Sequence, residues 1–152
     1  MKGQSLEEWA GASQMFALVF TDIVDSFMVV FRSASDALDF VLDLYEDTGH
    51  EKIKIRAGIH VGSARVIEDD MFGIMVNYTK RVESTENSAF IRLSNFAMTE
   101  INNDGQHARL KFNSRMVEFK GFPQRQTVWT VWDTRWAITK EFRPPRPSDI
   151  DR

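Results

Sequence analysis

Two aspartates stand in an otherwise apolar stretch near the N-terminus. Asp22 and Asp25 are three residues apart, and Ile23 and Val24 lie between them. Burying a carboxylate is costly unless a cation or hydrogen bonds compensate. Carboxylate oxygens are hard ligands that suit Mg²⁺ carried with the phosphates of a nucleotide. The pair therefore indicates a divalent-metal site, and the alternative is two strand-end carboxylates that face solvent or cap a loop.

A second pair of polar residues has helical spacing. Asn77 and Arg81 are four residues apart, so they project from one face of a helix. An amide and a guanidinium in this arrangement can hold sugar and phosphate oxygens during phosphoryl transfer. The simpler interpretation is an exposed polar face. Taken alone, Asp70 is an acid in the loop before this helix, and Lys120 is a residue of a turn.

Hydrophobic patterning predicts the elements that must position these residues. Apolar runs or alternation predict strands at 15–20, 26–31, 53–61, 64–67, 89–93, 109–119 and 126–132. The first two are expected to be buried on both faces, and 64–67 is expected to pair with 53–61. Helices are predicted from Ser33, over 73–85, and from 94 or 95 to about 101. Because strands and helices alternate before a closing hairpin, we expect an α+β fold with one mixed sheet and helices on one face.

One predicted strand carries small residues on one of its faces. Gly58, His60 and Gly62 alternate with apolar residues, so all three share a face. Small residues at such positions permit the close approach of another backbone or of a ligand. We expect His60 to have a structural rather than a catalytic role.

Composition narrows the function classes. A chain of 152 residues fits one domain, and zero cysteines exclude disulfide scaffolds, thiolate metal sites and cysteine nucleophiles. A net charge of -3 argues against a nucleic-acid partner, because such proteins usually carry a basic surplus. With no signal peptide and no membrane span in the sequence, we expect a cytoplasmic protein without a membrane partner.

The order of these motifs resembles the class III nucleotidyl cyclase catalytic domain, the adenylate/guanylate cyclase type. The similar segments are FTDIV (20–24), DSFMVVFRSASDAL (25–38), IRAGIHVGSARV (55–66), DDMFGIMVNYTKRVES (69–84), FIRLSN (90–95) and EFKGFPQRQTVWTV (118–131). The resemblance implies a ferredoxin-like fold with a mixed sheet. It divides the chain into an N-terminal extension (1–14), a cyclase domain (15–133) and a C-terminal tail (134–152).

The resemblance also implies a role for each matching residue near the phosphates. Asp22 and Asp25 match the two aspartates that hold two Mg²⁺ or Mn²⁺ ions, and the backbone at Ile23 matches a phosphate cradle. Asn77 matches the residue that positions the ribose, and Arg81 matches the one that stabilises charge in the transition state.

Two further matches concern the triphosphate and the base. Lys120 falls where the family often has a triphosphate-binding lysine, and Asp70 falls at its base-reading position. An aspartate there can accept a hydrogen bond from the exocyclic amine of adenine or cytosine, but it has no donor for guanine O6 or uracil carbonyls.

The sequence departs from the family between the two aspartate motifs. The family has two helices and most of a hairpin there, whereas Val24 is followed directly by Asp25. On one continuous strand the two aspartates would lie roughly 10 Å apart on opposite faces, too far to share ions about 4 Å apart. Our hypothesis is that a segment is missing from the sequence at this junction, and the alternative is a natural or engineered deletion. An intact mass of 17.6 kDa would contradict the missing segment.

The resemblance implies an enzyme that converts a nucleoside triphosphate to a 3′,5′-cyclic nucleotide and pyrophosphate. The expected assembly is a homodimer in which one chain supplies the metal aspartates and the other supplies Asn77 and Arg81. Two substrate classes stay open: ATP, and the pyrimidines UTP or CTP used by stand-alone bacterial cyclases of anti-phage signalling. The alternative function is an inactive cyclase-like domain that binds a nucleotide or a partner.

Overall fold

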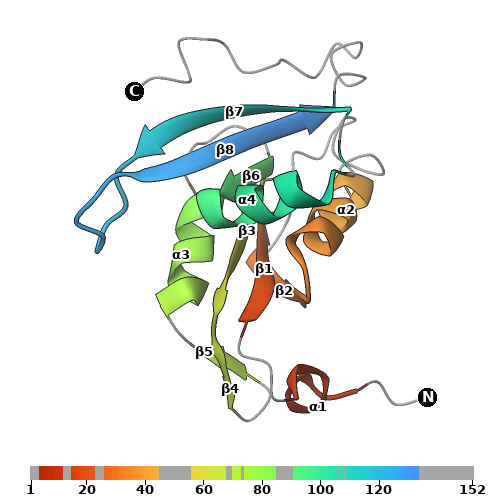
Figure 1. The fold of residues 1–152 in the computed structure, drawn as a ribbon. Helices are drawn as coiled ribbons and strands as arrows, with labels where there is room; N and C mark the ends of the chain where they lie inside the picture. Colours follow the sequence, from red (N-terminus) through yellow and green to blue (C-terminus); the bar gives the residue numbers. More distant parts are fainter. Residues whose placement is uncertain are drawn as a thin grey trace.

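The computed structural model describes residues 4–11, 15–22, 26–44, 56–67, 70–72, 74–84, 91–105, 107 and 109–133. The helices of these regions are α1 (Leu6–Ala10), α2 (Ala34–Leu44), α3 (Ile74–Glu83) and α4 (Asn95–Asp104). The strands are β1 (Met15–Asp22), β2 (Ser26–Phe31), β3 (Arg56–Ser63), β4 (Arg65–Ile67), β5 (Asp70–Phe72), β6 (Ile91–Ser94), β7 (Leu110–Val117) and β8 (Gln126–Asp133). Six strands form one sheet in the order β2-β1-β3-β6-β8-β7 (Figure 1). Its one parallel pair, β3 with β6, makes the sheet mixed, as predicted.

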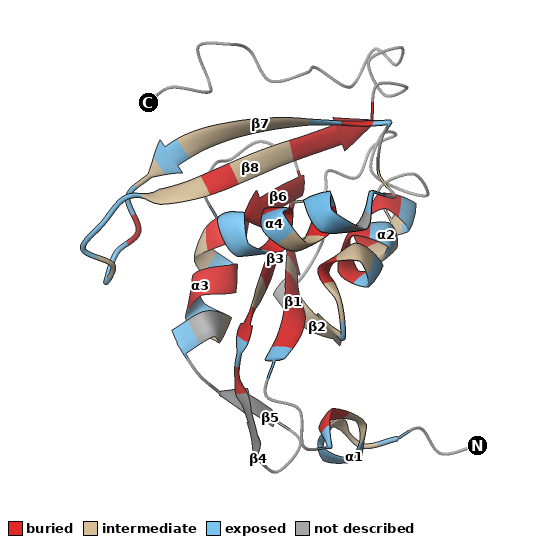
Figure 2. Cartoon of the chain, viewed as in Figure 1, coloured by how far each residue is buried: buried red, intermediate tan, exposed pale blue. Residues whose placement is uncertain are grey.

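The N-terminal apolar stretch forms two paired strands. β1 and β2 run antiparallel, with Asp22 opposite Ser26 and Ala17 opposite Phe31. Residues 15–31 are therefore not one continuous strand, so the separation of roughly 10 Å considered for that case does not apply. The Val24–Asp25 junction itself lies outside the described residues. Phe16 to Val19 are buried as predicted. The same prediction for residues 26–31 is wrong, because β2 is an edge strand whose residues Met28 to Phe31 are only half-buried (Figure 2).

The short strands after β3 do not pair as predicted. Residues 65–67 form β4, which pairs with β5 rather than with β3. Asp70 is the first residue of β5 and lies opposite Ile67, so it belongs to a strand and not to a loop. A local alternation pattern does not reveal its partner, because strand pairing depends on residues elsewhere in the chain.

The helices lie on both faces of the sheet. Ala57 and Ile59 of β3 belong to the main apolar core, which includes the buried faces of α2 and α4. Gly58 and His60 point to the opposite face, where they meet Glu83 and Tyr78 of α3. The expectation of helices on one face thus holds for α2 and α4 but not for α3. β3 is buried from both sides for this reason (Figure 2).

Local capping explains where two helices begin. The Ser33 hydroxyl accepts a hydrogen bond from the Asp36 amide at 3.1 Å at the start of α2. Ser94 does the same for the Ala97 amide at the start of α4, also at 3.1 Å. Helix α4 ends at Gly105, whose φ of 67° is a left-handed conformation that glycine adopts without strain. These serines confirm the predicted helix starts, since a side-chain oxygen satisfies an otherwise unpaired amide.

Candidate active site

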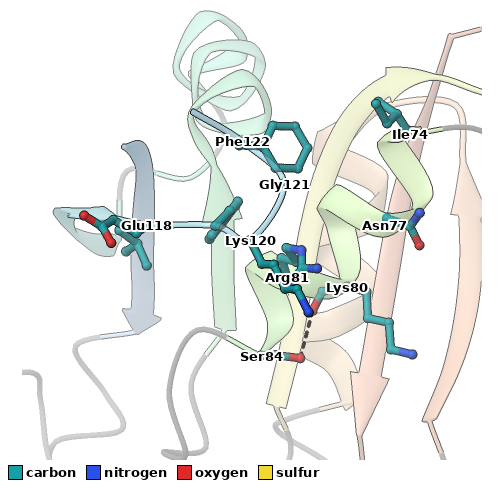
Figure 3. Close-up of a pocket in the computed structure, with 11 residues that line it drawn as sticks. Ile74, Asn77, Lys80, Arg81, Ser84, Glu118, Lys120, Gly121 and Phe122 are labelled. Atoms are coloured by element: carbon teal, nitrogen blue, oxygen red, sulfur yellow. Dashed lines mark hydrogen bonds between the residues drawn. The ribbon is translucent and has the colours of Figure 1, made fainter. Parts of the chain in front are cut away.

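A cavity of about 750 Å³ lies between α3 and the turn that joins β7 to β8 (Figure 3). The turn and the end of β7 line it with Lys120 and five neighbouring residues. Helix α3 lines it with Ile74, Asn77, Lys80 and Arg81, and Ser84 follows directly after the helix. The structure therefore brings together Asn77, Arg81 and Lys120, three residues that were predicted from separate parts of the sequence.

The packing of α3 decides which of its side chains reach this cavity. Tyr78 and Val82 are buried in a small apolar cluster with Phe119 and Val128. Asn77 and Arg81 each precede one of these buried residues, so they have the same four-residue spacing on the neighbouring side of the helix. Asn77 is exposed and Arg81 is half-buried. Burial of one helical face thus leaves Asn77 and Arg81 on the part of the helix that lines the cavity.

Tyr78 ties the helix to the turn that carries Lys120. Its ring lies 5.1 Å from the rings of both Phe119 and Phe122. Its hydroxyl donates a hydrogen bond to Oε1 of Gln126 at 2.9 Å, at the start of β8. Burial raises the pKa of Tyr78, so the hydroxyl remains protonated and continues to donate at neutral pH. These contacts set the position of the turn, and therefore of Lys120, relative to Arg81.

The charged lining of the cavity favours an anionic ligand. Three cationic side chains, Lys80, Arg81 and Lys120, line it together with one carboxylate, Glu118. Glu118 lies 3.7 Å from Nε of Arg125, which offsets its charge. Several cations beside an amide suit a ligand with phosphate and hydroxyl oxygens, because guanidinium and ammonium groups form charge-assisted hydrogen bonds to such oxygens.

His60 lies behind the cavity, in the packed interior. Its Nδ1 is 2.7 Å from the hydroxyl of Ser94, and its ring is 4.4 Å from the ring of Tyr78. The side chain is completely buried, and this burial lowers the pKa of His60 to about 4. A neutral, hydrogen-bonded histidine that packs under Tyr78 agrees with the structural role expected for it.

The predicted acidic residues lie in other elements. Asp22 ends β1, where it is opposite Arg56 of β3 and Ser26 of β2. Asp70 begins β5. The structure places these two by backbone alone, and Ile23 and Asp25 lie outside the described residues. Which side chains Asp22, Asp25 and Asp70 contact therefore stays a prediction.

The end of β1 carries one of the two aspartates predicted to hold a divalent cation. Asp22 is the cross-strand partner of Ser26, and Ser26 directly follows Asp25 in the sequence. A carboxylate such as that of Asp22 is the hard oxygen ligand that Mg²⁺ and Mn²⁺ prefer, and Asp25 lies outside the described residues. Among the residues whose side chains are described, no three His, Cys, Asp or Glu side chains form a group that could hold a metal. A cation here would need further oxygen ligands, such as those of a phosphate chain.

Sequence reasoning missed several residues of the cavity. Lys80 immediately precedes Arg81 and is three residues after Asn77, so helical spacing alone could have placed it on the same side. Ile74 is also part of the lining, although its side chain is 65% exposed. Phe122 was not predicted as a site residue, because an aromatic residue in a turn does not by itself indicate a site. Its place in the cavity follows from its packing against Tyr78.

This chain matches known proteins in structure, among solved structures, but not in sequence family. No protein-family model matches the chain, and no curated protein matches it. In the part of the chain that the structure describes, no helix is long and apolar enough to cross a membrane.

Solved cyclase structures are similar to this chain. An adenylate/guanylate cyclase/hydrolase from Silicibacter pomeroyi has a TM-score of 0.65 and 18% identity, over 80% of this chain and 98% of the other. The catalytic core of a rhodopsin-guanylyl cyclase with converted specificity, in complex with ATPαS, has a TM-score of 0.64 and 20% identity, over 79% and 96%. The guanylate cyclase domain of RhGC from Catenaria anguillulae, in complex with GTP, has a TM-score of 0.63 and 19% identity, over 79% of this chain and 97% of the other. The chain therefore has the α+β fold of the class III adenylate and guanylate cyclase domains.

Proposed function

We propose that this protein is a nucleotidyl cyclase, which converts a nucleoside triphosphate to a 3′,5′-cyclic nucleotide and pyrophosphate. The 3′-hydroxyl oxygen attacks the α-phosphorus and loses its proton to solvent. The new oxygen–phosphorus bond forms as the bond from the α-phosphorus to the bridging oxygen breaks, and pyrophosphate leaves with that electron pair. The observation that carries the proposal is the shared cavity of Asn77, Arg81 and Lys120 in a chain with the cyclase fold.

Each of these residues has a role that suits its position. Asn77 holds the ribose, because its amide can both donate to and accept from hydroxyl groups. Arg81 stabilises the charge that develops on the α-phosphate, since a fixed guanidinium is effective in a partly dehydrated site. Lys120 binds the triphosphate from the turn on the other side of the cavity. The structurally similar cyclase domains solved in complex with ATPαS and with GTP support a triphosphate ligand.

The aspartates complete the proposed site. Asp22 and Asp25 would hold two Mg²⁺ or Mn²⁺ ions, and the backbone at Ile23 would contact the phosphates. Such ions, when bound, lower the pKa of the 3′-hydroxyl and neutralise phosphate charge. This chain's contribution is to fix the backbone of Asp22 at the end of a strand paired on both sides.

We further propose a homodimer with the site between its chains. One chain supplies Asp22 and Asp25, and its partner supplies Asn77, Arg81 and Lys120, so a two-fold dimer has two complete sites. Cyclase domains of this fold include one solved as a non-canonical dimer, from Blastocladiella emersonii, and ones solved in a monomeric state, from Trypanosoma brucei.

For the base of the nucleoside triphosphate we propose two alternative classes. Asp70 favours ATP or CTP, because a carboxylate accepts a hydrogen bond from an exocyclic amine. The other proposed class is UTP or CTP, the substrates of bacterial cyclases of anti-phage signalling, and in that role the cyclic nucleotide would activate a separate effector.

A binding module without turnover is the second candidate function. The short β1–β2 connection favours it, because Asp22 and Ser26 are paired where the cyclase family has two helices and most of a hairpin. Purified protein incubated with ATP, GTP, CTP and UTP in the presence of Mn²⁺ separates the two. A cyclic product from at least one nucleotide is expected. If a dimeric sample forms none of the four cyclic products, the enzyme proposal is wrong and the binding module is favoured.

A further inference from the structure

A buried cluster of charged residues lies between α3 and the sheet. Arg92 of β6 is only 1% exposed, and Glu83, the last residue of α3, is 6% exposed. Nε of Arg56 in β3 lies 3.4 Å from Oε1 of Glu83. None of these three residues was predicted to have a role. Arginine and glutamate are rarely this buried unless they are paired, so the cluster needs an explanation.

Electrostatic interactions link these three residues. Burial and the charge of Arg56 lower the pKa of Arg92 to about 10, and the charge of Glu83 acts in the opposite direction. Arg92 therefore remains charged at neutral pH, and two guanidinium groups share the field of one carboxylate. Among the described residues, Oε1 of Glu83 makes no hydrogen bond, although it lies within ion-pair distance of Arg56. Such a cluster stabilises a fold less than apolar packing does, but removing one member is strongly destabilising.

Backbone packing places this cluster directly beside the catalytic end of α3. Gly58 lies opposite Arg92 in the sheet, and its missing side chain lets the backbone of Glu83 approach β3. Glu83 follows Arg81 by two residues. The last turn of α3 closes with the Ser84 amide, which donates to the Lys80 carbonyl at 3.1 Å. Any shift of Glu83 along the sheet would therefore move this turn, and Arg81 with it.

We propose that Glu83 is a positioning residue, which holds the last turn of α3 on the sheet through Arg56 and Arg92 and so aims Arg81 at the substrate phosphate. The proposal rests on the cyclase function proposed above. Glu83 does not line the cavity among the described residues, so it acts through Arg81 rather than on the substrate. Arg56 also lies opposite Asp22, so the cluster sits next to the strand that carries the first proposed metal ligand.

The kinetic test is a double-mutant cycle of Glu83→Gln and Arg81→Ala. Glutamine preserves the shape of the side chain but removes the charge that both arginines need. We expect Glu83→Gln to lower kcat by about 10- to 100-fold with little change in KM, since a misplaced catalytic group costs rate rather than binding. In the Arg81→Ala background the same change should cost almost nothing further. Equal losses in both backgrounds would overturn the proposal, because a merely structural residue acts additively.

A matched control is available at the far end of the β7–β8 hairpin. Asp133 is also a fully buried carboxylate, and it accepts a hydrogen bond from Nε of Arg109 at 2.9 Å. It lies opposite Leu110, at the other end of the hairpin from Lys120. We expect Asp133→Asn to lower stability but to leave kcat within twofold of wild type.

A second measurement keeps the proposal testable in case the cyclase function itself is wrong. Hydrogen exchange at the Ser84 amide reports the last turn of α3 without any substrate. We expect faster exchange there in Glu83→Gln and an unchanged rate in Asp133→Asn, and unchanged exchange in Glu83→Gln would overturn the proposal. If Glu83→Gln does not fold, Arg56→Gln replaces it in both experiments, because the Arg56 side chain is 26% exposed. Absence of cyclic products from the wild type contradicts only the proposed function.

Discussion

Gly58 and Glu83 pack backbone against backbone. A Cβ atom on Gly58 would lie 2.7 Å from Cα of Glu83, closer than real Cβ contacts come. The contact joins the central strand β3 to the end of α3 and leaves no space for any side chain. Glycine at position 58 is therefore a requirement of the packing on this face of the sheet, where the sequence had indicated a close approach of backbone or ligand.

The first prediction concerns this contact. Gly58→Ala should lower the free energy of unfolding by about 1–3 kcal/mol, because one extra methyl group must displace a helix backbone. Chemical denaturation followed by circular dichroism measures the change. Ser63→Ala, at an exposed position that ends the same strand, serves as the control and should unfold like the wild type. A Gly58→Ala protein as stable as wild type would show that α3 does not lie as close to β3 as described.

The second prediction concerns Arg81. Arg81→Ala should lower kcat by about 10²- to 10³-fold, with a smaller effect on KM, because the lost interaction is made mainly in the transition state. Steady-state kinetics with the preferred triphosphate measure both constants. Lys111→Ala, which removes an exposed cation from β7, should leave both unchanged. A rise in KM alone would assign Arg81 to substrate binding instead.

The third prediction tests whether the site is shared between two chains. Asp22→Ala and Arg81→Ala should each lose nearly all of the wild-type activity as purified homodimers. A heterodimer of the two restores one intact site, so an equal mixture after subunit exchange should recover about a quarter of wild-type activity. Recovery is measured by the rate of cyclic nucleotide formation. If the mixture is no more active than the separate variants although heterodimers form, Asp22 and Arg81 act within one chain, and the shared site is wrong.

The fourth prediction concerns pH. His60 has its pKa lowered to about 4 in the folded state from 6.5, so the unfolded chain binds more protons between these values. Stability should therefore fall as pH decreases from about 6.5 towards 4, by about 3 kcal/mol from this residue. Denaturation at pH 7 and at pH 5 measures the slope. His60→Gln cannot titrate, so its slope should be shallower, and equal slopes would mean that His60 is protonated in the folded protein.

Much of the local structure could be predicted because it depends on neighbouring residues. The starts of α2 and α4 follow from Ser33 and Ser94, whose hydroxyl groups satisfy nearby amides. Alternation and apolar runs predicted each strand of the main sheet, although not every bound. The pairing of β4 with β5 and the edge position of β2 were not predicted, because both depend on which distant strand lies alongside.

Residue types and spacing were enough to predict which side chains could do chemistry and on which elements most of them lie. The spacing of Asn77 and Arg81 placed them on one side of a helix, and the order of motifs indicated the cyclase fold that the structure has. That Lys120 joins them in one cavity follows from long-range packing, because the aromatic contacts around Tyr78 connect α3 to a distant turn. Long-range packing also places α3 on the face opposite α2 and α4. That arrangement depends on the contact between Gly58 and Glu83, and residues this far apart in the chain meet only when the whole sheet has formed.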